Sequence, residues 1–204
     1  MNHARAVAPR AKRHEPTWEI VQFFPAQGEW SEGEYLELDT NRPVEFTDGF
    51  LEVLPMPTLS HHSIMLYLYR ALLAFAEARH LGKVLVAGYP VRVRPGAYRE
   101  PDVVFFRAER AARAGEQYAE GADLVMEVVS PGGRDRDLRR KREEYAAAGI
   151  PEYWIIDPKL ALITVLRLAN GKYTVHGEFK RGTQATSALL NGFTVDVSAA
   201  LAAK

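Results

Sequence analysis

Apolar and polar residues alternate over residues 44–54, and the dipeptide Asp48-Gly49 interrupts the alternation. A period of two is typical of a half-buried strand, and Asp-Gly favours the positive φ angles of a two-residue turn. The stretch therefore predicts a β-hairpin. In its first strand Val44 and Phe46 would face one way and Glu45 the other, so exposure to solvent explains the polarity of Glu45 at least as well as function does.

Apolar residues spaced three and four apart predict helices elsewhere in the chain. The longest helix is expected to begin at an N-cap, Ser60, and to be closed by Gly82. A short helix is expected after Ser31, because Glu34 stands three residues later and completes a capping box. Further helices are predicted over residues 108–119 and 135–148 and at the C-terminus.

Runs of large apolar side chains predict the remaining strands. A strand over residues 102–106 is expected to pair with the alternating stretch 83–94 across a Pro95-Gly96 turn. A second hairpin is predicted over residues 161–177, with Asn170-Gly171 at its turn. A last short strand is expected over residues 193–197.

The order of elements in the second half of the chain predicts the fold class. A strand over residues 123–129, a helix over 135–148 and a strand over 152–157 form a βαβ unit with parallel strands. The whole pattern predicts a mixed β-sheet flanked by helices, an α/β (α+β) fold. We interpret residues 17–204 as a single domain and residues 1–16, which lack any period, as a flexible N-terminal arm.

Composition supports a globular protein and restricts the metals that it can bind. Of the 204 residues, 47% are hydrophobic and 25% are charged, as in ordinary globular domains. No apolar run reaches the roughly 20 residues of a membrane span, and the basic N-terminus lacks the apolar segment of a signal peptide, so we expect a cytoplasmic protein. Because the sequence contains no cysteine, a metal would need oxygen or imidazole ligands, which favours Mg²⁺ or Mn²⁺.

The charge balance argues against a protein that coats nucleic acid. The formal net charge is zero, whereas non-specific phosphate binding needs a basic surface. Contacts to phosphate would then depend on local charge. Two basic stretches are candidates, namely the arm that carries Arg5, Arg10, Lys12 and Arg13, and the run of residues 134–142.

Two carboxylates stand on strands that otherwise consist of large apolar side chains. Asp102 opens the strand 102–106, and Glu127 lies between Val125 and Val129 on a half-buried face. Burying a lone carboxylate is costly, so each should be paired, protonated or bound to a metal. A turn role explains Asp102 about as well as a functional role, and an ion pair with an arginine would explain Glu127, but two such acids together favour a functional site.

Lys141 is the candidate cation of this site. It shares a helical stripe with Leu138 and Tyr145, so it should face the sheet and need a buried partner. The right-handed βαβ connection would bring its ammonium group toward the carboxylates. The alternative is an i, i+4 pair with Asp137 on a solvated face. His61, near the start of the long helix, is a candidate ligand or general base, although an imidazole there is more often exposed or hydrogen-bonded.

Carboxylates that hold Mg²⁺ beside a lysine suit the hydrolysis of phosphodiesters. The metal polarises a phosphoryl oxygen and lowers the pKa of a bound water, and the lysine orients that water or stabilises the developing charge. We therefore predict a metal-dependent nucleic-acid hydrolase. Its acids would meet in one pocket, where a divalent cation relieves their repulsion.

Several short motifs follow one another in a specific order along the chain. They are Val44-Glu45-Phe46-Thr47-Asp48-Gly49, His61-His62, Pro101-Asp102, Glu127-Val128-Val129-Ser130-Pro131, Lys141 with Tyr145, and the strand from Glu152 to Pro158. This order resembles the Uma-two family of bacterial endonucleases over roughly residues 30–200. That family belongs to the PD-(D/E)XK nuclease-like superfamily, so the resemblance implies a restriction-endonuclease-like sheet flanked by helices.

The resemblance also implies roles for individual residues. Asp102 and Glu127 would bind the metal, with Glu45 as a further acidic ligand. The superfamily motif places a lysine two residues after the glutamate, where this sequence has Val129, so Lys141 from the following helix would replace it. We expect an endonuclease that acts on DNA as a possible homodimer, since nucleases that cut both strands often work as symmetric pairs. The alternative is an inactive nuclease-fold protein that binds nucleic acid or another protein.

Overall fold

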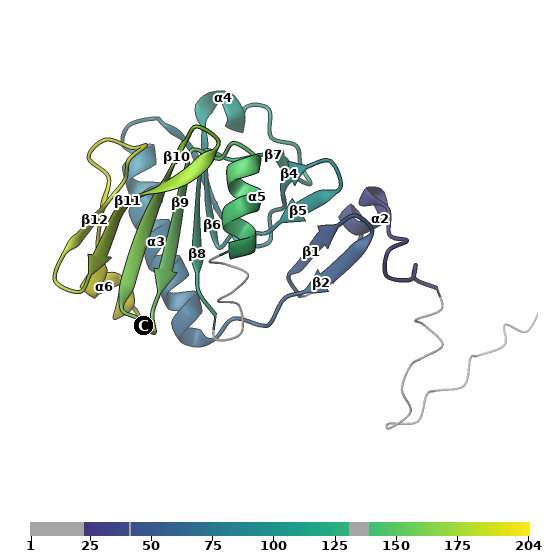
Figure 1. Cartoon of the computed structure of the whole chain (residues 1–204), viewed down its shortest axis with the longest axis horizontal. Coiled ribbons are helices and arrows are strands. Elements are labelled where there is room, and N and C mark those ends of the chain that lie inside the picture. Colours follow the sequence, from purple (N-terminus) through teal and green to yellow (C-terminus); the bar gives the residue numbers. More distant parts are fainter. Residues whose placement is uncertain (1–22, 41, 131–138) are drawn as a thin grey trace, which may run out of the picture.

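Two mixed β-sheets with helices around them form the structure (Figure 1), which confirms the predicted α/β (α+β) class. The computed structural model describes residues 23–40, 42–130 and 139–204. The larger sheet has six strands in the order β11-β10-β9-β8-β6-β3. Its strands are β3 (Gly82–Val86), β6 (Val103–Arg107), β8 (Leu124–Val128), β9 (Glu152–Asp157), β10 (Leu162–Ala169) and β11 (Lys172–Lys180).

The centre of the larger sheet is the predicted βαβ unit. Strands β8 and β9 are parallel, and α5 (Lys141–Ala147) lies in the connection between them. The neighbouring pairs β6-β8 and β9-β10 are antiparallel. The β10-β11 hairpin turns at Asn170 and Gly171, whose φ angles of 51° and 74° are the positive values that an Asn-Gly turn adopts.

Helices α3 (Leu59–Glu77) and α5 cover opposite faces of the larger sheet (Figure 1). On one face, Leu68 and Leu72 of α3 belong to the same apolar cluster as Phe105 of β6. On the other face, Tyr145 of α5 clusters with Val125 of β8. Alternation of side chains along each strand thus builds two apolar cores, one on each side of the sheet.

The smaller sheet has five strands in the order β2-β1-β5-β4-β7. Its strands are β1 (Val44–Thr47), β2 (Phe50–Val53), β4 (Val91–Arg94), β5 (Ala97–Arg99) and β7 (Ala119–Glu120). The hairpin β1-β2 turns at Asp48 and Gly49, with φ angles of 47° and 86°. Before it lies α2 (Glu32–Leu36), where Ser31 and Glu34 form the predicted capping box. The local patterns therefore predicted both features correctly.

A two-stranded sheet and two short helices complete the described part of the chain. They are α4 (Ala108–Ala111), β12 (Gln184–Thr186), β13 (Thr194–Asp196) and α6 (Val197–Leu201). The C-terminal segment packs on α3, where the rings of Phe75 and Phe193 lie 5.2 Å apart. None of the helices in the described ranges combines the length and the apolar character that a membrane span requires.

The boundaries predicted for the longest helix were wrong at both ends. Thr58, not Ser60, is the N-cap of α3, and its side chain accepts a hydrogen bond from the backbone N–H of His61. Both residues are of the capping type, so the pattern could not choose between them. At the other end the helix stops at Glu77, and Gly82 begins β3.

The predicted pairing of strand 102–106 with the stretch 83–94 was correct for residues 83–86, but the Pro95-Gly96 turn does not connect the paired strands. This turn joins β4 to β5, whereas β6 pairs with β3 and β8. The stretch 83–94 therefore contains two strands, β3 and β4, that belong to different sheets. Within residues 108–119 the helix is limited to α4. Residues 1–16 and 135–138, the predicted arm and the start of the predicted helix, lie outside the described residues.

Candidate active site

The register of the larger sheet brings Asp102 and Glu127 to neighbouring positions. Val103 pairs with Met126 in the antiparallel β6-β8 ladder, so the preceding Asp102 stands opposite Glu127. Glu127 projects to the side of Val125, the side that α5 covers, whereas Asp102 lies just before β6 and reaches His61 of α3. The two residues are thus neighbours at the end of the β6-β8 pair, where the Val128 N–H donates to Asp102.

Glu127 is held by two donors from α5. The side chain is buried, and its Oε1 accepts hydrogen bonds from Lys141 Nζ at 2.7 Å and from the Tyr145 hydroxyl at 2.7 Å. Burial raises the pKa of Tyr145 well above its ordinary value, and the charges of Glu127 and Glu45 raise it further, so this hydroxyl stays protonated and donates. Lys141 is 2% exposed, so the solvated alternative for this lysine is wrong.

Glu45 does not face solvent, contrary to the expectation from its strand pattern. It is 1% exposed, because the polar side of β1 is turned toward two buried cations. Its Oε1 lies 3.1 Å from Lys141 Nζ, and its Oε2 lies 3.7 Å from Arg99 Nε. Neither carboxylate oxygen has a hydrogen-bond partner, so the ion pairs with these cations must compensate its burial.

Asp102 is held at the end of its strand by β8 and by α3. Its Oδ2 accepts a hydrogen bond from the backbone N–H of Val128 at 2.7 Å and lies 3.2 Å from His61 Nε2. The same imidazole nitrogen is 2.9 Å from the Val128 carbonyl oxygen. Because both neighbours are acceptors, Nε2 carries a proton and donates. Burial alone would lower the pKa of His61, but its contacts with Asp102 and the Val128 carbonyl raise it above the usual value.

Sequence reasoning missed a buried arginine behind this site. Arg99 is fully buried, and its Nε and Nη2 donate to the two carboxylate oxygens of Glu144 at 2.7 and 2.6 Å. Its Nη1 donates to the Phe46 carbonyl at 2.9 Å. Charges of alternating sign thus follow one another from Glu127 through Lys141 and Glu45 to Arg99. The sequence did contain an indication of this arginine, because the predicted site has more acids than cations. That excess calls for a second buried cation but does not identify it.

Glu100 is a further carboxylate that the sequence interpretation did not single out. It stands two residues before Asp102 in an extended segment and accepts a hydrogen bond from the backbone N–H of Val44 at 3.3 Å. Burial raises the pKa of Glu100 to about 7, an effect that this hydrogen bond opposes and the charge of Glu45 increases. A carboxyl group with such a pKa changes its charge near neutral pH.

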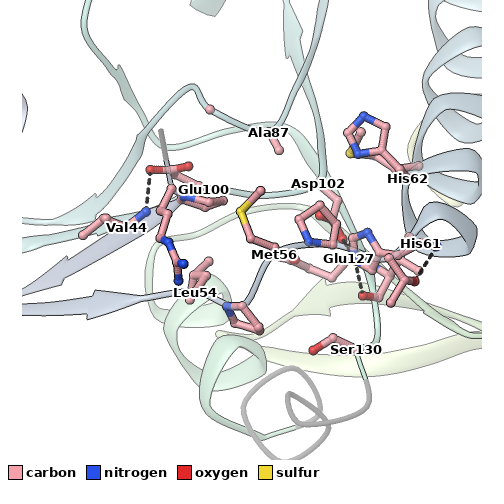
Figure 2. A pocket seen from close by; sticks show the side chains of 18 of the residues that line it. Val44, Leu54, Met56, His61, His62, Ala87, Glu100, Asp102, Glu127 and Ser130 are labelled. Atoms are coloured by element: carbon pink, nitrogen blue, oxygen red, sulfur yellow. Dashed lines mark hydrogen bonds and ion pairs between the residues drawn. The ribbon is translucent and has the colours of Figure 1, made fainter. Parts of the chain in front are cut away.

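One large cavity adjoins these groups (Figure 2). Its volume is about 1070 Å³, and Asp102, Glu127 and Lys141 line it. Glu45 is not among the described lining residues, so it lies behind the lysine. In the view of Figure 2, Asp102 and Glu127 gather on one side of the cavity and Glu100 lies on the other. The cavity gives a ligand access to the buried carboxylates.

Among the described residues, a lysine takes over part of the role that we expected of a metal ion. Lys141 lies within reach of both Glu45 and Glu127, so it already relieves the repulsion that we assigned to a divalent cation. No three His, Asp or Glu side chains of the described segments converge into a ready-made metal site. Asp102 and Glu127 nevertheless fit Mg²⁺ or Mn²⁺ as a donor pair, because Mg²⁺ prefers oxygen and takes few protein ligands while it keeps several waters.

Comparison with protein families and structures places this site in context. Residues 32–198 match the model of the Uma2 family, described as "putative restriction endonuclease". The chain belongs to the Uma2 family. The matched span contains every residue of the site described above, so the resemblance inferred from the motifs is confirmed. Comparison with curated proteins finds no match.

A solved structure shares the fold of this Uma2 protein. It is a crystal structure described as "a putative nuclease belonging to DUF820" from Anabaena variabilis ATCC 29413. The TM-score is 0.68 at 17% sequence identity, with 83% of this chain and 97% of that chain covered. At this identity the likeness establishes that the two chains share a fold.

The lysine of the site comes from a helix and not from the strand that carries Glu127. Val129 stands two residues after Glu127, and α5 brings Lys141 to 2.7 Å from this glutamate. The ammonium and the carboxylate are 14 residues apart in sequence, yet they meet because α5 packs on the face of β8 from which Glu127 projects.

Proposed function

We propose that this Uma2 protein is a metal-dependent endonuclease that hydrolyses phosphodiester bonds of nucleic acid, with DNA as its substrate. The observation that carries the proposal is the placement of Asp102, Glu127 and Lys141 around one cavity. In a chain with a nuclease-like fold, these groups supply two oxygen donors for a cation and one ammonium group for a phosphate or a water.

Asp102 and Glu127 are the residues that would hold Mg²⁺ or Mn²⁺. The cation, when bound, supplies polarisation of a phosphoryl oxygen and a water of lowered pKa. The backbone at Val128 holds Asp102 in place, because its N–H donates to the carboxylate. We assign His61 the related task of positioning Asp102 from α3, since its Nε2 reaches both the carboxylate and the Val128 carbonyl.

Lys141 is the residue that orients the attacking water or stabilises charge on the phosphate. Its ammonium lies 2.7 Å from Glu127 and 3.1 Å from Glu45, so two carboxylates from different strands determine its position. We assign Glu45 to the positioning of this lysine. The metal-ligand role for Glu45 stays a prediction, since the described contacts of its carboxylate are with cations.

The test compares cleavage by the wild-type protein with cleavage by Glu127→Gln in Mg²⁺ or Mn²⁺. We expect the rate on fluorescently labelled DNA to fall at least about 100-fold in the variant. Glutamine keeps the shape of the side chain and an acceptor for Lys141, so the variant should stay folded, which thermal unfolding followed by circular dichroism would check. EDTA should abolish cleavage by the wild type.

Glu143→Gln is the matched control for this experiment. Glu143 is exposed on α5, next to the turn that carries Lys141, and its substitution removes the same charge. The control should cleave at the wild-type rate. Undiminished cleavage by Glu127→Gln, or cleavage by the wild type that does not need a divalent cation, would contradict the assignment.

Binding of nucleic acid or of a protein without catalysis is the second candidate function. It is favoured by the ion pairs that Glu45 and Glu127 form with Lys141 and Arg99, since these already offset the buried negative charge. Calorimetry with Mn²⁺ decides between the two. Absence of a binding heat favours the inactive protein, and binding that Glu127→Gln abolishes favours the nuclease.

A further inference from the structure

The charged groups of the proposed active site are recessed. Glu127 and Lys141 are 4% and 2% exposed, and the side chain of Asp102 is 15% exposed. A ligand reaches them through the cavity of about 1070 Å³. A duplex is a stiff rod that carries its phosphates on the outside, so an intact duplex is a poor fit to groups at the end of such a cavity. A single unpaired strand can bend into it.

Much of the cavity has no part in the proposed hydrolysis. Its other walls include Leu38, Leu54, Pro55, Met56 and Pro90, all from the connections that follow α2, β2 and β3. The total volume is that of a site for a drug-sized molecule, for which roughly 300–1,000 Å³ is typical. Apolar walls beside a phosphate-cleaving centre suit the face of a nucleobase, because enzymes that take a base out of the stack hold it between aromatic or apolar side chains.

The charge of the lining also favours a short contact with nucleic acid. The described lining residues include four carboxylates and three basic side chains, namely Glu100, Asp102, Glu127, Asp157, Arg42, Lys141 and Lys159. Lys141 pairs with acids, whereas Arg42 and Lys159 are exposed. Within the described part of the lining, two exposed cations suit about two phosphates, whereas a protein that binds a duplex can neutralise about 6–10 of them.

We propose that the cavity binds an unpaired nucleotide, with its base against the apolar walls around Met56 and its phosphate toward Asp102 and Glu127. The substrate of the enzyme is then single-stranded or locally unpaired nucleic acid. In the view of Figure 2, Met56 lies between Glu100 and the group of Asp102 and Glu127. This inference rests on the proposed function, because we place the phosphate beside Asp102 and Glu127 as the residues proposed to carry out phosphodiester cleavage.

The first measurement compares the binding of two forms of one DNA sequence. A short fluorescein-labelled strand and the same strand annealed to its complement are titrated with the full chain in Ca²⁺, which takes oxygen ligands as Mg²⁺ does, and a gel run afterwards checks that the DNA is uncut. Fluorescence anisotropy should show at least about 10-fold tighter binding of the single strand, because only its bases are free to enter the cavity. Equal or tighter binding of the duplex would overturn the proposal.

The salt dependence of binding tests the short contact. Each phosphate that is neutralised on a single strand contributes about −0.7 to the slope of log K against log salt, so contacts at Arg42 and Lys159 predict a slope of about −1 to −2. Arg42→Ala and Lys159→Ala should each make the slope shallower. A slope of about −5 or steeper would show a long electrostatic contact and would contradict the proposed cavity mode.

A pair of variants on one segment tests the apolar wall. Met56 and Val53 are 60% and 56% exposed, so neither substitution threatens the core, but only Met56 is among the described lining residues. Met56→Ala should weaken single-strand binding about 3- to 10-fold and leave duplex binding unchanged, since it removes a contact to the base. Val53→Ala should match the wild type. Equal behaviour of the two variants would contradict base binding at this wall.

Cleavage assays separate this inference from the proposed function. If both DNA forms are cut equally well in Mg²⁺, the protein is a nuclease and the preference for unpaired substrate is wrong. If the single strand binds preferentially and neither form is cut in Mg²⁺ or Mn²⁺, the cavity binds unpaired nucleic acid as proposed, and the assignment of nuclease activity fails.

Discussion

Glu127 on β8 and Glu152 on β9 are carboxylates on adjacent parallel strands, and both are almost completely buried, with 4% and 0% exposure. Their surroundings differ. Glu127 accepts hydrogen bonds from an ammonium group and a hydroxyl group and borders the cavity. Glu152 accepts hydrogen bonds from neutral groups and is not among the residues described as lining that cavity.

The donors to Glu152 tie a C-terminal loop to the larger sheet. They are Trp154 Nε1 at 2.6 Å, Ser187 Oγ at 2.6 Å, and the backbone N–H groups of Ala188 at 2.6 Å and Leu189 at 2.7 Å. Neutral donors aimed at a carboxylate stabilise its charge in place, and here they leave no approach for a ligand through the cavity. Glu152 therefore has a structural role, because it connects this C-terminal loop to β9.

The comparison shows that burial of an acid alone does not identify a functional site. What separates the two glutamates is the nature of the partner and the presence of a cavity. An ammonium on a flexible lysine stem can interact with a ligand as well as with its carboxylate, whereas backbone N–H groups in a folded loop cannot be redirected. Substitutions at Glu152, Lys141, Glu144 and Arg140 test this distinction.

Removal of the structural carboxylate should have the largest effect on stability. Glu152→Ala would leave several buried donors unsatisfied, and we expect the free energy of unfolding to fall by about 4–6 kcal/mol. Urea denaturation would measure this change. The folded fraction of the variant should retain wild-type cleavage and wild-type Mn²⁺ binding. A stable Glu152→Ala protein that has lost its activity would reverse the roles that we assign to the two glutamates.

Removal of the Lys141 ammonium should destabilise the fold less than the loss of Glu152, and a bound cation should offset part of this destabilisation. Lys141→Met keeps the volume of the side chain but leaves Glu45 and Glu127 facing each other, which should lower the free energy of unfolding by about 3 kcal/mol. In the proposed function these carboxylates bind a divalent cation, and a ligand of the folded state stabilises it by mass action, so Mn²⁺ should raise the Tm of this variant more than that of the wild type. A smaller rise in the variant would argue against a cation site at these acids.

The pH dependence of stability should report the ion pair behind the site. Burial by itself raises the pKa of Glu144, but the hydrogen bonds and charges of Arg99 and Arg140 outweigh it and hold the pKa below the ordinary glutamate value. A carboxylate with a lowered folded pKa stabilises the fold at neutral pH and loses this contribution as the pH falls. Glu144→Gln should therefore cost about 2 kcal/mol at pH 7. The difference in the free energy of unfolding between Glu144→Gln and the wild type, measured by urea denaturation, should decrease as the pH is lowered. A difference that does not change with pH would contradict the ion pair between Glu144 and Arg99.

Arg140, at the outer end of the charge network, should contribute least to the free energy of unfolding. Arg140 pairs with Glu52 at 2.9 Å and with Glu144 at 3.2 Å, and its side chain is 42% exposed. Exposed pairs are screened by water and salt, so Arg140→Ala should change the free energy of unfolding by less than about 1 kcal/mol. The change should shrink further at high salt. A loss as large as that for Lys141→Met would mean that the whole network acts as one unit.

Features that depend on a few neighbouring residues could be predicted from the sequence. The turns at Asp48-Gly49 and Asn170-Gly171 were recognisable because few residue types tolerate positive φ angles. The βαβ unit was recognisable from the order of a buried strand, a helix and a second strand. Asp102 and Glu127 stood out because each interrupts or opens an apolar strand, and the ladder places them opposite each other.

The surroundings of Glu45 could not be predicted in this way. Its alternation with Val44 and Phe46 is the same whether the polar face of β1 meets water or a layer of buried cations. Arg99 decides between these possibilities, and it lies on β5, which joins β1 only through a pairing distant in sequence. The cap of α3 was ambiguous for a simpler reason, since Thr58 and Ser60 are equally suitable residue types.

The amino-acid sequence was enough to predict the turns, the strand acids, the lysine on the inward stripe of its helix, and the family to which these motifs belong. Three features became visible only in the folded chain: which acids Lys141 joins, which buried glutamate is surrounded by neutral donors, and how much space remains beside the carboxylates. Local patterns report the conformation and the facing of each residue, whereas the energy of a buried charge depends on groups that only the packing of distant segments brings within a few ångströms.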